Sequence, residues 1–110
     1  MKTELYEEDR YIVLKAYGKL DTIHSPEFTK TLQEVLQKRS PLFLLDLSEV
    51  SFLSSSGLQA LLIGAKTSKQ NNTEFVVVGM NEMLNDVFEM SGFNNFIKSF
   101  NSQKEALESL

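Results

Sequence analysis

The chain has 110 residues, 42% apolar and 24% charged, which is the size and composition of one globular domain with its own core. Because it has no cysteine, disulfides, thiolate metal ligands and thiol catalysis are excluded. The net charge is −4 and no basic cluster is present, so neither nucleic acid nor an anionic membrane surface is an expected partner.

The N-terminus is acidic and polar where a signal peptide would be basic and then apolar. The longest apolar stretch, residues 58–65, is far shorter than the roughly 20 residues that span a bilayer. We therefore expect a single domain over residues 1–110 in the cytoplasm. Its expected partner is a protein or a small molecule, with no cofactor and no metal.

Two strands are predicted before the first helix. The first closes near Leu5 and is followed by a polar turn at residues 7–9. Residues 11–17 are rich in β-branched and aromatic side chains, which predicts a second strand that Gly18 stops.

A helix is predicted from Ser25, with this serine as N-cap and Pro26 at the first helical position. The helix should end at Pro41. Apolar residues at i, i+4, i+7 and i+8 predict its buried face, which consists of Phe28, Leu32, Val35 and Leu36.

Two buried strands and a helix are predicted next. Residues 42–47 form a nearly continuous apolar run, which is typical of a strand covered on both faces. A turn at residues 71–73 precedes a second such strand at residues 75–78, ended by Gly79. The helix between them should run to about Gln70, with an apolar stripe of Leu58, Leu61, Leu62 and Ala65.

The last third of the sequence predicts two more helices, one before and one after a short strand near residues 97–100. Asn81 can cap the first helix and Gly92 can end it. Ser102 and Glu105 match a capping box ahead of the second. The apolar stripes are Leu84, Val87 and Phe88, then Ala106, Leu107 and Leu110. Strands and helices thus alternate, which predicts an α/β fold with a mixed β-sheet flanked by about four α-helices.

Three serines, residues 54–56, stand at the predicted start of the second helix. A serine there can cap the helix, and the free N–H groups of a helix N-terminus can also bind an anion such as phosphate. A nucleophile elbow, G-x-S-x-G, and a phosphate-binding P-loop are both absent. The only histidine, His24, has no carboxylate or nucleophile partner recognisable in the sequence. Catalysis is therefore not expected, and a serine hydrolase is the weakest candidate.

Residues 44–62, LLDLSEVSFLSSSGLQALL, resemble the signature of the STAS domain, the fold of bacterial anti-sigma factor antagonists. In that family the signature runs D-L-x-x-V-x-[FY]-[ML]-D-S-[ST]-G-L. Residues 18–22, GKLDT, are similar to the family's G-E-[IL]-D, and residues 84–97 resemble its L-F-x-[MI]-[ST]-G-L-x-x-I-[IF]. The resemblance covers nearly the whole chain in the right order. It implies a small mixed sheet flanked by helices.

The resemblance also implies a partner switch without enzymatic activity. In the family, an anti-sigma factor that is also a serine kinase phosphorylates the antagonist. The unphosphorylated antagonist binds that kinase and so frees the sigma factor. A serine phosphatase removes the phosphate and resets the cycle. On this chain the phosphoacceptor would be Ser55, and the free protein is expected to be a monomer. The implied partner-binding residues are Asp21, Ser54, Ser55, Ser56, Gly57 and Leu58. Ser54 stands where the family usually has aspartate, so the alternative is a STAS scaffold or signalling subunit that binds a protein without being phosphorylated.

Overall fold

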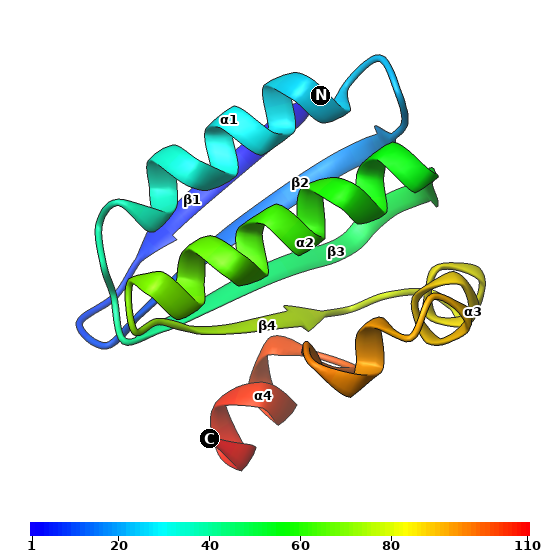
Figure 1. The fold of residues 1–110 in the computed structure, drawn as a ribbon. Helices are drawn as coiled ribbons and strands as arrows, with labels where there is room; N and C mark the ends of the chain where they lie inside the picture. Colours follow the sequence, from blue (N-terminus) through cyan, green and yellow to red (C-terminus); the bar gives the residue numbers. More distant parts are fainter.

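The computed structural model describes residues 1–110 and is built around one five-stranded sheet (Figure 1). The strands lie in the order β1-β2-β3-β4-β5; β1 is antiparallel to β2, and the other neighbours are parallel. Their bounds are β1 (Lys2–Glu7), β2 (Tyr11–Leu20), β3 (Leu42–Leu53), β4 (Glu74–Val78) and β5 (Lys98–Phe100). The predicted mixed sheet is confirmed.

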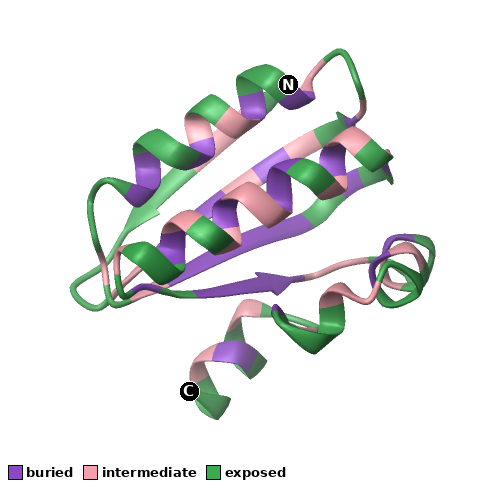
Figure 2. Ribbon diagram, in the orientation of Figure 1, coloured by how far each residue is buried: buried purple, intermediate pink, exposed green.

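Four helices flank the sheet, as predicted, and a single 3-10 turn, η1 (Phe93–Asn95), lies between α3 and β5. They are α1 (Ser25–Leu36), α2 (Ser55–Gln70), α3 (Glu82–Met90) and α4 (Gln103–Ser109). α1 and α2 lie side by side over the strands (Figure 1), and their buried positions face the sheet (Figure 2).

The sheet is apolar on both faces, and each face contributes to a separate core. The larger core contains buried residues of α1, α2 and α3 packed on the sheet. The smaller core lies on the opposite face and consists of Val13, Leu44, Val76, Val78 and, from α4, Ala106. Because side chains alternate between the faces of a strand, residues 43–47 of β3 and all but the first residue of β4 are buried on both sides. This is what their continuous apolar runs predicted.

β2 and β3 are longer than the sequence indicated. The predictions that Gly18 stops the first and that residues 42–47 are the whole of the second are both wrong. Gly18 has a φ of 104° and lies at a register shift between the two strands, where a residue without Cβ accommodates the irregularity. Pairing between β2 and β3 then continues to Leu20 and Leu53. Backbone hydrogen bonds between the two strands keep these polar ends in the sheet, although their side chains lack the apolar pattern of a strand.

α1 begins and ends differently from the prediction. His24 occupies the N-cap position and makes no side-chain cap bond, while Ser25 is the first helical residue and its hydroxyl donates to the carbonyl of Asp21. The helix ends at Leu36, and Arg39 has a φ of 53°, so the chain has left the helix before Pro41. The predicted apolar face is confirmed, since all four of its residues are buried.

The other helix starts follow their sequence signals. The Asn81 side chain accepts a 2.8 Å hydrogen bond from the Leu84 amide, and Ser102 accepts one of 3.1 Å from the Glu105 amide. In the last helix only Ala106 is buried, whereas Leu110 lies beyond α4 and is exposed. The predicted stripe of α4 is therefore shorter than expected.

Candidate functional site

The end of β2 and the start of α2 are joined through Ser54. The carbonyl oxygen of Leu20 accepts hydrogen bonds from the Ser54 amide at 3.0 Å and from its hydroxyl at 3.1 Å. The same hydroxyl oxygen accepts a 3.1 Å bond from the Gly57 amide, which makes Ser54 the N-cap of α2. The capping role predicted for the serine run is thus confirmed at Ser54, whose hydroxyl both donates its proton and accepts a hydrogen bond.

Gly57 is buried where α2 meets the ends of β2 and β3. A Cβ at this position would lie 2.6 Å from the carbonyl oxygen of Leu20 and 2.8 Å from the Leu53 side chain. Such distances are shorter than van der Waals contact, so this turn of the helix needs a residue without a side chain. Gly57 brings the serines next to β2 without contributing a side chain of its own.

The two remaining serines lie in different surroundings. Ser55 is the first residue of α2; its side chain is exposed and its hydroxyl forms no hydrogen bond within the protein. Ser56 is half-buried, with its Oγ 3.4 Å from Oγ1 of Thr22. It lies at a shallow hollow of about 290 Å³ between the first turns of α1 and α2. Of the three serines, Ser55 is therefore the one whose hydroxyl is free and accessible.

Asp21, directly after β2, closes the turn that leads into α1. Its Oδ1 accepts a 3.0 Å hydrogen bond from the His24 amide and lies 2.7 Å from Nδ1 of the His24 ring. The backbone bond is the main reason why the pKa of the Asp21 carboxyl is lowered, and the imidazole adds to the effect. Asp21 thus stays ionised and directs its charge toward His24.

The expectation that His24 has no carboxylate partner is wrong, because the three-residue turn after β2 folds Asp21 back onto it. The pair resembles two-thirds of a catalytic triad, yet no serine hydroxyl is hydrogen-bonded to the imidazole. The Ser56 hydroxyl approaches Thr22, and that of Ser54 is committed to the cap. The geometry therefore holds no activated nucleophile.

Two exposed apolar side chains in the segments that carry Asp21 and the serines were not singled out in the sequence. Ile23, in the loop between β2 and α1, is 83% exposed, and Phe52, near the end of β3, is 42% exposed. A large β-branched side chain in a polar loop was the available signal for Ile23, while Phe52 lay beyond the predicted end of its strand. We call Ile23, Phe52 and Ser55 the serine-turn surface. Leu58, half-buried, packs against the larger core.

No group of three or more His, Cys, Asp or Glu side chains is placed to hold a metal ion. None of the helices combines the length and hydrophobicity needed to cross a bilayer.

A mixed sheet with helices on it, and a free serine at the start of the helix after its central strand, define a STAS-like architecture. The STAS domain model matches residues 2–106, and the chain therefore belongs to the STAS domain family.

Relatives and solved structures agree with this assignment. An anti-sigma-B factor antagonist of Listeria monocytogenes is 28% identical over 103 residues, which are 93% of this chain and 90% of the relative. An anti-sigma factor antagonist from Mycobacterium paratuberculosis has the same fold, with a TM-score of 0.89 at 22% identity over 98% of this chain and 92% of that one. The phosphorylated form of the Bacillus cell fate determinant SpoIIAA gives a TM-score of 0.72 at 17% identity, over 98% of both chains.

Proposed function

We propose that this protein is an anti-sigma factor antagonist, a non-enzymatic protein of a single domain that binds an anti-sigma factor with serine kinase activity and so releases a sigma factor. Phosphorylation of Ser55 by that kinase ends the interaction, and a serine phosphatase restores it. The names of the curated relatives support the antagonist role. The free protein acts as a monomer in the cytoplasm.

The choice of Ser55 rests on how differently the hydroxyls of the three adjacent serines are engaged. A kinase must reach the hydroxyl and remove its proton during transfer. The Ser54 hydroxyl donates to Leu20 and accepts from Gly57, so phosphorylating it would break the cap of α2. Ser55 is exposed and makes no such bonds.

The place of Ser55 also explains how one phosphate could switch a partner without unfolding the protein. A phosphoserine adds about −1.5 to −2 charges. The N-terminus of a helix carries roughly half a positive charge and unpaired N–H groups, so it tolerates this addition. A partner that covers the exposed Ile23 and Phe52 together with Ser55 would bury the phosphate, which must then give up its water. A nearly complete switch needs about 5.5 kcal/mol of differential affinity.

The test combines phosphosite mapping with binding measurements, using the anti-sigma factor kinase that copurifies with this protein. Wild-type protein should gain one phosphate with ATP, and Ser55→Ala should gain none. Ser56→Ala should be phosphorylated as wild type. Ser54→Ala should also be phosphorylated, although loss of the cap should lower its free energy of unfolding by about 1 kcal/mol.

A second experiment separates the effect of a negative charge on kinase binding from its effect on stability. Ser55→Asp should weaken kinase binding strongly while changing the free energy of unfolding by no more than about 1 kcal/mol. Phosphate on Ser54 or Ser56 in the Ser55→Ala variant would show that the acceptor is a different serine.

The alternative is a STAS scaffold or signalling subunit, and the observation in its favour is Ser54 itself. The family's usual aspartate could cap α2, but an ionised carboxylate could not donate a hydrogen bond to the Leu20 carbonyl as the Ser54 hydroxyl does. This chain therefore departs from the family at the residue next to the acceptor, which favours a member that binds a partner without being phosphorylated. Stable binding of the copurifying partner with no phosphate transfer to any serine would establish this alternative.

A further inference from the structure

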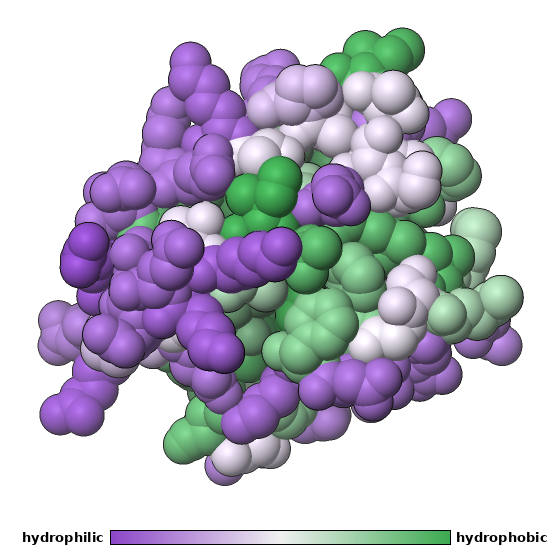
Figure 3. All heavy atoms as spheres, viewed as in Figure 1, coloured by the Kyte–Doolittle hydropathy of each residue, from purple (hydrophilic) through white to green (hydrophobic).

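A larger hollow lies at the opposite end of α2 from the serine-turn surface. Its volume is about 580 Å³, within the range of roughly 300–1,000 Å³ that is typical of small-molecule sites. It is bounded by the second half of α2, the start of β4 and Phe96, the residue after η1. Figure 3 shows apolar residues gathered in the middle of this face, with hydrophilic side chains to the left of them and below.

The lining of the hollow includes four apolar side chains, Leu62, Ala65, Phe75 and Phe96. Phe96 is 57% exposed, an unusual state for a phenylalanine with this much apolar surface. It is held in place rather than loose, because its ring packs against Phe93 at 5.2 Å between centroids, and Phe93 packs edge-on against Phe88 at 5.9 Å. The hollow therefore has a fixed aromatic wall that a ligand could cover.

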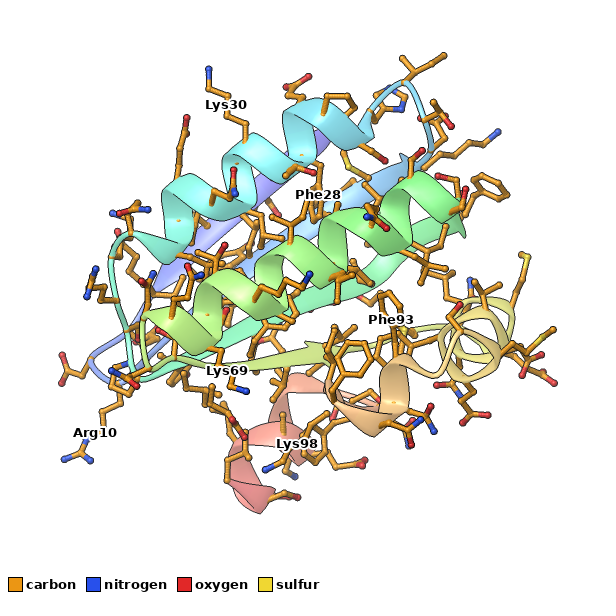
Figure 4. All side chains as sticks on the ribbon, viewed as in Figure 1. Arg10, Phe28, Lys30, Lys69, Phe93 and Lys98 are labelled. Carbon is orange, nitrogen blue, oxygen red and sulfur yellow. The ribbon has the colours of Figure 1, made fainter.

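The rim of the hollow is positively charged, in a protein whose net charge is −4. Lys66 and Lys69 line it from α2, are exposed, and form no ion pair. The carboxylate of Glu74, also in the lining, is paired with Lys98 at 2.9 Å. Figure 4 shows Lys69 and Lys98 on the same side of the molecule as Phe93. The uncompensated charge at the hollow is thus that of two lysines.

The polar side chains deeper in the hollow are already committed. The Ser68 hydroxyl donates to the Gly64 carbonyl at 2.8 Å, and the Thr73 hydroxyl donates to the Ser40 carbonyl at 2.8 Å. Neither has a proton left for a ligand, so recognition of a head group falls to the lysines. A lysine ammonium is a flexible point charge, which suits a single small anion and sets little demand on its geometry.

We propose that this hollow binds a small amphipathic carboxylate, with its apolar chain or ring against Phe75 and Phe96 and its carboxylate between Lys66 and Lys69. The volume fits one small molecule, the lining fits an apolar body, and the rim fits one negative charge. The site is separate from the serine-turn surface, so it does not depend on the partner switch.

Decanoate, below its micelle concentration, is a suitable probe. Titrated into the full chain and followed by calorimetry and amide NMR shifts, it should bind saturably and perturb residues 62–75 and Phe96. The double variant Lys66→Gln/Lys69→Gln should bind about fivefold more weakly, the effect expected from losing two exposed ion pairs. Phe96→Ala should weaken binding as well. Lys30→Gln, which removes an exposed lysine from α1 (Figure 4), is the matched control and should bind as wild type.

Charge and occupant are tested with two further probes. Decyltrimethylammonium has the same chain and the opposite charge, so equal binding of the two compounds would overturn the anion preference. Absence of saturable decanoate binding, or binding unaffected by both the lysine pair and Phe96→Ala, would overturn the site. An acidic amphipathic peptide that binds at these residues more tightly than decanoate would show that the occupant is a protein segment instead. Circular dichroism of each variant confirms that it is folded.

Discussion

Tyr17 of β2 and Tyr6 of β1 both donate a hydrogen bond to the carboxylate of Glu4, on the sheet face opposite α1 and α2. The ammonium groups of Lys2 and Lys15 lie 4.9 Å and 5.4 Å from the centre of the Tyr17 ring. The hydrogen bond from Tyr17 is the main reason why the pKa of Glu4 is lowered. The same bond raises the pKa of Tyr17 to about 12, since an ionised phenol could no longer donate.

This network predicts a loss of stability in alkali. Below pH 10, Tyr17 is protonated in both the folded and the unfolded chain, and its contribution is fully present. Between pH 10 and pH 12 the unfolded chain releases the proton while the folded chain keeps it, so the free energy of unfolding should fall across this window. Urea unfolding of wild type and Tyr17→Phe from pH 8 to 12 tests this. The wild type should lose its advantage over the variant as the pH rises, and a constant difference would contradict the assignment.

At the scale of elements, α2 is positioned mainly by small residues, with Leu61 as its one fully buried leucine. The residues it buries are Gly57, Ala60, Leu61, Gly64 and Ser68, whereas Leu58, Leu62 and Ala65 of the predicted stripe are only half-buried. Small side chains allow a helix to approach a sheet closely, and this approach places the Ser54 cap within reach of the Leu20 carbonyl. Packing at the inner face of α2 thus presents the serines at the surface.

Gly57→Ala should therefore destabilise the protein, although alanine is the better helix former. The added Cβ meets a backbone carbonyl that cannot rotate away, so we expect the free energy of unfolding to fall by about 1–3 kcal/mol. Ser55→Ala is the matched control in the same turn and should be close to neutral, since Ser55 is exposed. Chemical denaturation measures both, and equal stabilities would show that α2 can move away from β2 at no cost.

At the scale of the whole molecule, the two faces of the sheet are covered very unequally. α1, α2 and α3 contribute to the larger core, whereas the smaller core receives from the helices only Ala106 of α4 as a buried residue. α4 is also bound to the sheet by a 2.7 Å hydrogen bond from the side-chain Nε2 of Gln103 to the buried carboxylate of Asp46. The short C-terminal helix is therefore the helix that shields the β4 and β5 part of that face from water.

Ala106→Asp should open this face. A carboxylate buried without a partner costs about 3 kcal/mol or more, and the least costly response is for α4 to leave the sheet. Hydrogen exchange should show α4 losing protection while the amides of β3 keep theirs. Ser109→Asp adds the same charge at an exposed position of α4 and should leave the protection pattern unchanged. Uniform loss of protection across the sheet in Ala106→Asp would show that α4 does not open independently.

Those features that depend on near neighbours in the chain were predictable from the sequence. The order of strands and helices follows from apolar runs and stripes, and the caps at Ser54, Asn81 and Ser102 follow from side chains that bond an amide three residues away. The serine motif likewise identifies the segment of the candidate site from the sequence alone. All of these signals are local, because the groups that interact are close in sequence.

Only the tertiary structure decided the features that depend on distant segments. β2 and β3 run past Gly18 and residue 47 because they pair with each other, and no local signal records that pairing. The three serines are alike in sequence, yet the Leu20 carbonyl, 34 residues away, engages Ser54 and leaves Ser55 free. The larger hollow arises because the segment after η1 brings Phe96 to α2. The proposed phosphoacceptor and the proposed second site thus both depend on which distant residues the fold brings together.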